Sequence, residues 1–202
     1  MKKHIINISI FLNVGVILCL TPLFLIGQNE WNQKTDFGGS RRKAAVSFSI
    51  NGSVFIGTGY DSLGFRKDFW RWDQVTDTWS QIADFGGTAR YKAVAFTING
   101  KAYVGTGVDS CGLTQDFWEY NPTNDKWTSK SNFGGESRYL AACFTINDKA
   151  YVGTGVSNSG NKKDFWEYDP ITDSWVRIAD FQYELYGATG ISIMDKGYIG
   201  LG

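Results

Sequence analysis

Residues 104–120 read VGTGVDSCGLTQDFWEY, and this stretch carries the pattern that decides the fold. Closely similar letters begin at residue 56, as IGTGYDSLGFRKDFWRW, and at residue 152, as VGTGVSNSGNKKDFWEY. The step from one copy to the next is therefore a constant 48. Tryptophans outside the stretch keep the same step: Trp31, Trp79, Trp127 and Trp175. Because several independent positions share one spacing, the sequence identifies a repeat protein.

Each repeat is predicted to consist of short β-strands without a helix. In the middle repeat the strands are expected at residues 91–98, 101–107, 116–122 and 126–133. Asn99-Gly100 separates the first two and is a strong hairpin signal. An eight-residue loop at 108–115 precedes the third strand. No segment has a helical period over about three turns, so a helical solenoid is not expected. Groups of four antiparallel strands are typical of β-propeller blades.

The repeated unit also resembles the kelch repeat of galactose-oxidase-like propellers. The pattern is R-x-x-A…I-N-G-K-A-Y-V-G-T-G…D-F-W-E-Y-D-P-x-T-D-x-W, and it spans residues 42–79, 90–127 and 138–175. This resemblance covers nearly all of the chain after residue 27 and implies an all-β, kelch-type β-propeller of four-stranded antiparallel blades. One departure is that kelch strands usually end in adjacent glycines, whereas here they are split, as in Gly57-Thr58-Gly59.

The chain is predicted to begin with an export signal. Lys2, Lys3 and His4 precede a mostly apolar run at residues 5–27, which favours a signal peptide cleaved after Gly27. An uncleaved membrane anchor is the alternative. In both cases the rest of the chain is exported, to be secreted, periplasmic or on the cell surface.

The chain after Gly27 holds about 3.6 repeats. A fourth strand is expected at residues 28–37, followed by units at 38–85, 86–133 and 134–181 and a truncated unit at 182–202. Propellers typically have four to eight blades, so an incomplete ring is expected, with a small or oligomer-completed ring as the alternative. Open blade edges would favour self-association.

Composition narrows the function classes. Twenty basic and twenty acidic residues cancel, so no excess charge favours nucleic acid, and a membrane is expected only through an uncleaved signal. The sole histidine is His4, so the later chain has no Ser-His triad and no histidine ligands for the copper site of galactose oxidase. We expect no cofactor and no metal site. Cys111 and Cys143 form no disulfide framework, although an exported chain can oxidise them.

Most repeated residues are interpreted as blade architecture. A phosphate-binding loop needs a helix after its glycines, whereas here another strand follows in every copy. The same interpretation is given to the repeated tryptophans, with sugar stacking as the alternative. These structural residues are Gly57, Gly105, Gly153, Trp70, Trp118, Trp166, Trp79, Trp127 and Trp175.

Ligand-binding candidates lie at one end of the blades. In an antiparallel blade, the connection from strand 4 to the next strand 1 and the loop between strands 2 and 3 emerge on the same face. Arg42, Arg90 and Arg138 recur in the first kind of connection, where they can bind a ligand carboxylate or pair with neighbouring carboxylates and carbonyls. The variable loops add polar candidates: Asp61, Ser62, Asp109, Ser110 and Asn158. Solvated decoration is the alternative for these loops.

The sequence is compatible with three functions. The favoured one is an exported propeller that binds a glycan or a protein through these loops. The second is a carbohydrate-active enzyme, because the resemblance includes kelch-type sialic acid mutarotases, and Glu136 is a weak catalytic candidate where the other units carry Ser40 and Thr88. A single carboxylate is not the pair that general acid–base catalysis prefers. The third is a structural surface protein without a dedicated ligand.

Overall fold

The structure is a computed structural model that describes residues 31–202. The chain divides into two units, Met1–Gln33 and Lys34–Gly202, and the second unit contains the repeats. The predicted signal peptide at 1–27 lies outside the described residues, so it stays a prediction. Over residues 31–202 no helix is long and apolar enough to cross a membrane.

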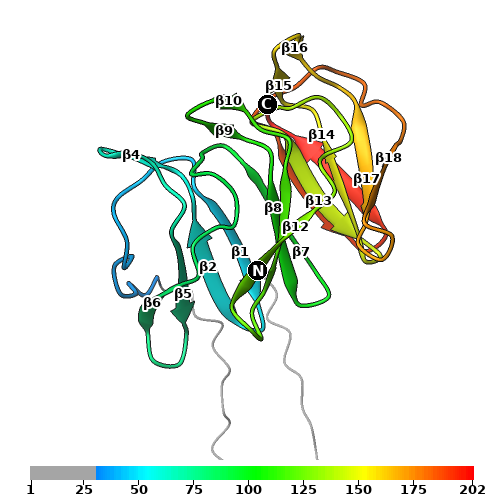
Figure 1. Ribbon diagram of the computed structural model, residues 1–202. Helices are drawn as coiled ribbons and strands as arrows, with labels where there is room; N and C mark the ends of the chain where they lie inside the picture. Colours follow the sequence, from blue (N-terminus) through cyan, green and yellow to red (C-terminus); the bar gives the residue numbers. More distant parts are fainter. Residues whose placement is uncertain (1–30) are drawn as a thin grey trace, which may run out of the picture. The chain divides into compact units, whose positions relative to one another are not determined.

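Three complete four-stranded antiparallel sheets form the first, second and third blades (Figure 1). The first blade contains β1 (Val46–Ile50), β2 (Ser53–Gly57), β5 (Phe69–Asp73) and β6 (Thr78–Ile82). The second contains β7 (Val94–Ile98), β8 (Lys101–Gly105), β11 (Phe117–Asn121) and β12 (Lys126–Lys130). The third contains β13 (Ala142–Ile146), β14 (Lys149–Gly153), β17 (Phe165–Asp169) and β18 (Ser174–Arg177). Strands pair in chain order within each sheet, which confirms the predicted four-stranded blade.

In the first and second blades the first hairpin is closed by the predicted Asn-Gly turn, whereas the third blade has Asn147-Asp148 there. In the second blade Asn99 has φ 50° and Gly100 has φ 72°, and the first blade repeats this at Asn51 and Gly52. Both residues of a type I′ turn need positive φ, which Asn and Gly tolerate best. The turn therefore sets the register that pairs Val94 with Gly105.

The eight-residue loops contain more structure than predicted. Each folds back as a small hairpin whose two strands are only two residues long. The strand pairs are β3 (Tyr60–Asp61) with β4 (Gly64–Phe65), β9 (Val108–Asp109) with β10 (Gly112–Leu113), and β15 (Val156–Ser157) with β16 (Gly160–Asn161). A glycine with positive φ in each loop makes the reversal, at Gly64, Gly112 and Gly160.

The last unit forms one hairpin among the described residues, β19 (Thr189–Ile193) with β20 (Lys196–Gly200). This unit is one residue shorter than the 48-residue repeat, and the deletion falls between Phe181 and Leu185. Phe181 N–H still bonds Lys163 O as Phe133 N–H bonds Gln115 O. Leu185, one position short of a full repeat after Arg138, supplies the carbonyl that bonds Gly155 N–H. Leu185 therefore takes the place of the repeated arginine.

The fourth strand predicted at 28–37 is not observed over residues 31–37, which belong to no strand. Residues 28–30 lie outside the described chain. A strand needs a hydrogen-bonding neighbour, and the described part of the last unit has only the hairpin β19–β20. Thr35 and Phe37 contact the first blade instead, where Phe37 meets Trp79 edge-on with ring centroids 5.0 Å apart.

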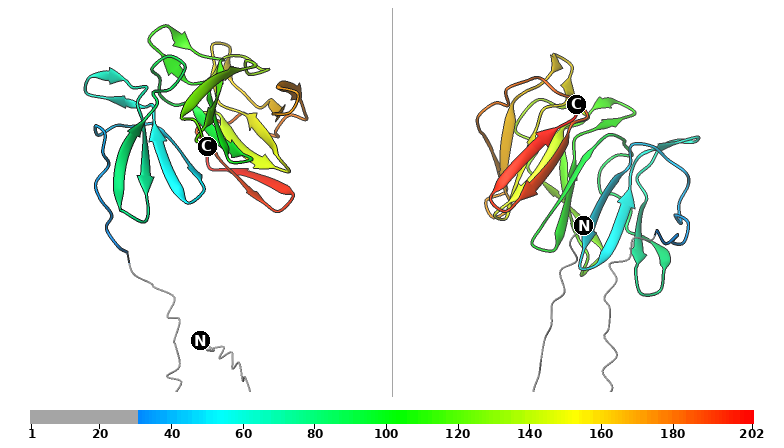
Figure 2. Two further views of the ribbon diagram at one scale, coloured as in Figure 1. Left: turned by 60° about the horizontal axis from the view of Figure 1, so that its bottom comes forward. Right: turned by 180° about the vertical axis from the view of Figure 1, so that it is seen from behind.

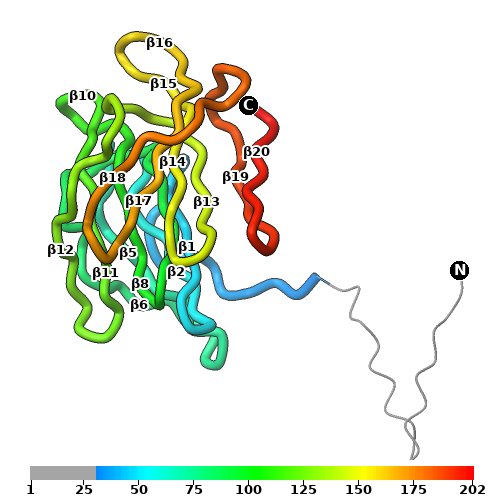
Figure 3. The backbone as a smooth tube through the Cα atoms, turned by 90° about the vertical axis from the view of Figure 1, so that its right-hand side faces the viewer, coloured from blue at the N-terminus to red at the C-terminus, as the bar shows by residue number. Residues whose placement is uncertain are grey.

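Successive blades pack face to face in chain order. The first strands β1, β7, β13 and β19 contact one another in that sequence, and Figures 2 and 3 show the sheets and the final hairpin side by side. Trp127 lies 4.9 Å from Phe69 of the first blade and 5.1 Å from Phe85, measured between ring centroids. Trp175 makes the equivalent contacts with Phe117 and Phe133, at 5.0 and 5.1 Å. Equivalent tryptophans thus have equivalent environments at each junction, as a propeller requires.

The repeated glycines are explained by crowding within each blade. A Cβ atom on Gly57, Gly105 or Gly153 would lie 2.3–2.4 Å from the phenylalanine ring on the neighbouring strand. In β8 the paired residue is Phe117, directly across from Gly105. The crowding therefore comes from the third strand of the same blade.

Candidate functional site

One end of the blades gathers the connections that the sequence analysis singled out. Short bridges join each blade-to-blade connection to the small hairpin beside it: Lys43 to Tyr60, Tyr91 to Val108 and Tyr139 to Val156. Figure 3 shows β10, β15 and β16 together at this end. We call this end the loop face. Its side chains come from a constant frame and from loops that differ between blades.

The repeated arginines are held inside the protein. Arg90 and Arg138 are fully buried, and the side chain of Arg42 is 3 % exposed. Arg90 makes a two-pronged ion pair with Asp116, at 2.6 and 2.8 Å, and also donates to the carbonyls of Thr88 and Thr106. The guanidinium carbon lies 4.9 Å from the ring centroid of Phe85. These contacts use the donors that a ligand would need. The arginines are therefore paired with neighbouring carboxylates and carbonyls, which was one of the two interpretations of the sequence.

The aspartates in these pairs were not singled out from the sequence. Asp68, Asp116 and Asp164 each bind the arginine and also accept a hydrogen bond from a tryptophan indole at 2.7 Å. Burial raises the pKa of Asp68 and Asp164, but the arginine and the indole N–H outweigh it and hold the pKa below its ordinary value. The sequence could have identified these aspartates, because each is the D of the DFW motif that recurs in every complete repeat.

The aspartates of the variable loops hold those loops in place. Asp61 accepts hydrogen bonds from Ser40 Oγ, from Leu63 N–H and from Arg66. The bond from Ser40 and the Arg66 guanidinium hold the pKa of Asp61 at about 2. Asp109 repeats this arrangement with the Thr88 hydroxyl and the N–H groups of its own hairpin.

Among the other loop candidates, Ser62, Ser110 and Asn158 are exposed and spread over three different hairpins. The structure does not bring them together. Cys111 and Cys143 are free thiols, so the disulfide alternative is absent. Within residues 31–202 no group of three or more His, Cys, Asp or Glu side chains is arranged to hold a metal ion.

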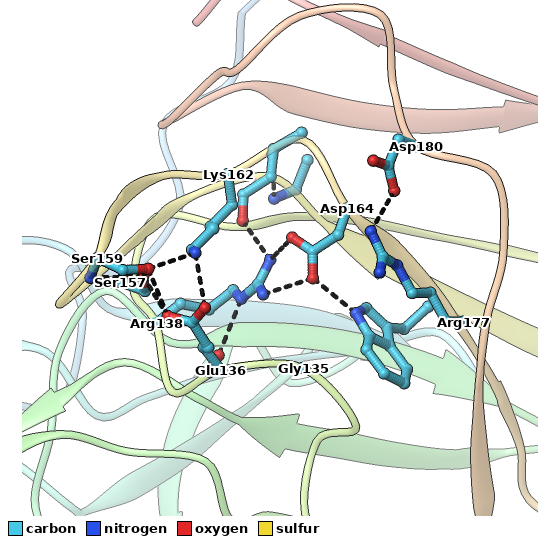
Figure 4. A network of polar contacts seen from close by, with 12 residues as sticks. Gly135, Glu136, Arg138, Ser157, Ser159, Lys162, Asp164, Arg177 and Asp180 are labelled. Atoms are coloured by element: carbon cyan, nitrogen blue, oxygen red, sulfur yellow. Dashed lines mark hydrogen bonds and ion pairs between the residues drawn. The ribbon is translucent and has the colours of Figure 1, made fainter.

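In the third blade, the carboxylate and the hydroxyl that join the connection to the small hairpin exchange places. Glu136 stands in the position of Ser40 and Thr88, and Ser157 stands in the position of Asp61 and Asp109. Ser157 Oγ donates to Glu136 Oε2 at 2.8 Å, and Lys162 Nζ lies 2.7 Å from Glu136 Oε1 (Figure 4). Lys162 and the Ser157 and Ser159 hydroxyls hold the pKa of Glu136 at about 2. The carboxylate is therefore ionised at neutral pH.

An open pocket of about 670 Å³ lies beside this network. Its charged lining comes from the third blade and from the connection after it: Glu136, Lys162, Lys163, Asp164, Arg177, Asp180 and Glu184. Trp166 and Gln115 also line it. The pocket offers cationic donors, carboxylate acceptors and an indole within one concave surface.

A local difference between blades accompanies the pocket. In the second blade, the Gln115 amide donates to the carbonyls of Phe133 and Gly135, at 2.8 and 2.6 Å, and so ties its hairpin to the next connection. Lys163 is the equivalent residue in the third blade. Within residues 31–202 its side chain has no counterpart of the two hydrogen bonds that the Gln115 amide makes. The space that an amide bridges in one blade therefore stays open in the next.

Of the sequence-predicted ligand and catalytic residues, only Glu136 lines this pocket. Sequence reasoning missed Lys162, Lys163, Arg177 and Glu184, because the residue types at these positions vary from one repeat to the next. The usable signal was that Glu136 differs from Ser40 and Thr88 at an otherwise small polar position.

These features define the class of protein. Four-stranded antiparallel blades repeated about every 48 residues and packed through equivalent tryptophans have the fold of a kelch-type β-propeller. Among solved structures the chain is similar to YjhT, with a TM-score of 0.69 and 20 % sequence identity. The match covers 80 % of this chain and 59 % of the YjhT chain, so this chain spans about three fifths of that structure. No protein-family model matches the sequence, and no curated protein matches it.

Proposed function

We propose that this chain is a binding module that holds a glycan in the pocket beside Glu136. One observation carries the proposal: a pocket of about 670 Å³ on the loop face combines cations, carboxylates and an indole. Ligand pockets usually have volumes of about 300–1,000 Å³. Residue types that vary between copies of a constant frame are typical of recognition surfaces.

The lining favours sugar hydroxyls over a flat protein surface. Each hydroxyl both donates and accepts a hydrogen bond, and the pocket supplies both partners, with donors from Lys163 and Arg177 and acceptors from Glu184. Trp166 adds an apolar surface that can contact a sugar ring. Export is part of this proposal, because an exported protein meets extracellular glycans.

The environment of Glu136 favours binding over acid–base catalysis. A general acid or base works best when its pKa is near the working pH. The Lys162 ammonium and two serine hydroxyls instead keep the pKa of Glu136 at about 2. Such a carboxylate positions Lys162 and accepts hydrogen bonds, and it is a weak base.

The test is retention of the full chain on a glycan array. Changing the exposed residues Lys163 and Arg177 together to alanine should abolish retention, because both line the pocket. Lys67→Ala is the matched control, since Lys67 is the equivalent of Lys163 in the first blade, and it should leave retention unchanged. The proposal is wrong if no glycan is retained or if both variants behave alike.

A further inference from the structure

A second cavity lies away from the loop face, at the junction between the first and second blades. Its volume is about 390 Å³, and it is reached beside the Asn-Gly turn of the first blade and the Pro turn of the second. Its lining residues are Ile50, Asn51, Ser53, Phe55, Arg71, Ile82, Tyr120, Pro122, Thr123 and Asp125. No residue is shared with the pocket beside Glu136.

The cavity has an apolar floor and one cation. Ile50, Phe55 and Tyr120 line it with exposed fractions of 6, 2 and 2 %. The side chain of Arg71 is 47 % exposed. Its Nε–H donates to Ser53 Oγ at 3.0 Å, and Nη2 lies 3.8 Å from Asp73 Oδ2 at the surface. Within residues 31–202 the remaining N–H groups of Arg71 have no hydrogen-bond partner.

The next blade junction shows what normally occupies this place. There Lys101, Tyr103 and Glu119 stand where the first blade has Ser53, Phe55 and Arg71. Glu119 accepts from the Tyr103 hydroxyl and from Lys101, each at 2.8 Å, and Lys130 lies 3.6 Å away. A buried carboxylate surrounded by its own donors thus fills this junction.

The third blade keeps the same set of residues, Lys149, Tyr151 and Glu167. The Tyr151 hydroxyl donates to Glu167 at 2.9 Å, and Lys149 pairs with the same carboxylate. The first blade therefore departs from the other two at all three positions. It loses a lysine and a hydroxyl, and it carries an arginine where the others carry the glutamate.

We propose that this cavity binds a small monocarboxylate whose body is apolar, such as an aromatic acid. The ligand carboxylate would pair with the unengaged N–H groups of Arg71 and accept a hydrogen bond from Ser53 Oγ. The ligand would thus supply the negative charge that Glu119 supplies inside the next junction. Guanidinium–carboxylate pairs are strong when both N–H groups of the fork are engaged. The apolar body would cover Phe55 and Ile82, which line the floor and wall.

Asp125 sets a limit on the charge of the ligand. It lines the same cavity, and it accepts from the Tyr120 hydroxyl at 2.9 Å and from Ala83 N–H at 3.0 Å. Because Asp125 and its equivalents Asp77 and Asp173 recur in every complete blade, it belongs to the frame. Its negative charge disfavours a second carboxylate in the ligand.

The test is an NMR titration of the full chain with benzoate, benzamide and inorganic phosphate as probes. Benzoate should bind, and the neutral benzamide and the compact phosphate should bind about tenfold more weakly or worse, since each lacks one half of the recognition. Amide signals from Ser53 to Phe55 and around Arg71 should move with benzoate. If benzamide or phosphate binds as well as benzoate, or if benzoate does not bind, the proposal is overturned.

A triple variant provides the decisive control. Ser53→Lys, Phe55→Tyr and Arg71→Glu together install the residues that the second blade carries at these positions, so the fold should be preserved. Benzoate binding should fall about tenfold or more, because the new glutamate replaces the ligand carboxylate. Lys163→Ala with Arg177→Ala should leave it unchanged. Undiminished benzoate binding by the folded triple variant would overturn the proposal.

Discussion

Arg90 is a charged side chain with no exposed surface, which is costly unless its charge is matched. Asp116 matches it through two hydrogen bonds of 2.6 and 2.8 Å, and two backbone carbonyls and two threonine hydroxyls take the other donors. A buried ion pair adds little net stability compared with apolar residues, but breaking it leaves one charge without a partner. At the scale of the residue, the repeated Arg–Asp–Trp set therefore secures each blade in one arrangement.

We predict that Arg90→Ala lowers the free energy of unfolding by about 3 kcal/mol, because Asp116 keeps its charge and loses its partner. Arg177→Ala is the control. Arg177 pairs with Asp180 at 2.9 Å, but its side chain is 58 % exposed, so its loss should cost less than about 1 kcal/mol. Urea denaturation of both variants checks the prediction, and equal midpoints would contradict it.

The threonine that separates the two repeated glycines of each blade has a strained backbone conformation. Thr58, Thr106 and Thr154 have φ of 56°, 58° and 58°, a left-handed conformation that β-branched residues rarely adopt. All three are fully buried. In the kelch pattern of adjacent glycines, a glycine at this point would adopt the same conformation without strain.

At the scale of the element, β8 and β20 provide a natural comparison. Gly105 ends β8 and Gly200 ends β20 at equivalent points of the repeat, allowing for the residue lost before Leu185. A Cβ on Gly105 would lie 2.4 Å from the Phe117 ring and 2.6 Å from the Asp116 carbonyl oxygen, whereas a Cβ on Gly200 would have no neighbour within 4 Å. The requirement for glycine thus comes from the third strand of the blade.

We expect Gly105→Ala to lower the free energy of unfolding by about 1–3 kcal/mol, the usual cost of overpacking. Gly200→Ala should change it by less than about 0.5 kcal/mol, because it adds a methyl group in open space. Thermal or urea unfolding of the two variants makes the comparison. A similar loss in both would show that the strand end itself, and not Phe117, requires glycine.

At the scale of the whole molecule, stability depends on how many neighbours a blade has. The second blade is covered on both faces, by the cluster around Phe55 and Tyr120 and by the cluster around Phe96 and Tyr168. In the hairpin β19–β20, Ile191 and Ile193 are 52 and 54 % exposed, while the equivalent Phe96 and Ile98 of the second blade are 5 and 4 % exposed. Self-association through such surfaces stays a prediction.

We predict a matching gradient in backbone hydrogen exchange. Amides of β8 should exchange at least about a hundredfold more slowly than those of β19 and β20, because opening β8 exposes two packed faces. Hydrogen–deuterium exchange of the full chain, read by mass spectrometry of peptides from each strand, measures this difference. Uniform protection across both regions would contradict the prediction.

The blade was predictable from the sequence because its residues recur. Phe117 and Trp127 have equivalents one repeat away, and each copy confirms that the position is set by packing within a blade or between blades. The strands, the Asn-Gly turns and the shared face of the loops followed from this pattern. Residues 31–37 do not form the strand expected at 28–37. A strand needs a neighbour to pair with, and the local sequence does not show whether that neighbour is present.

The sequence by itself determined the repeat, the four strands of each blade and the positions that must be aromatic or glycine. Only the tertiary structure decided that Arg90 pairs internally, that Lys163 leaves open a space which Gln115 bridges elsewhere, and that Arg71 faces a cavity. The physical reason is that strand periodicity is a local property read along the chain. A pocket depends instead on side chains from different blades, which meet only after the sheets have packed together.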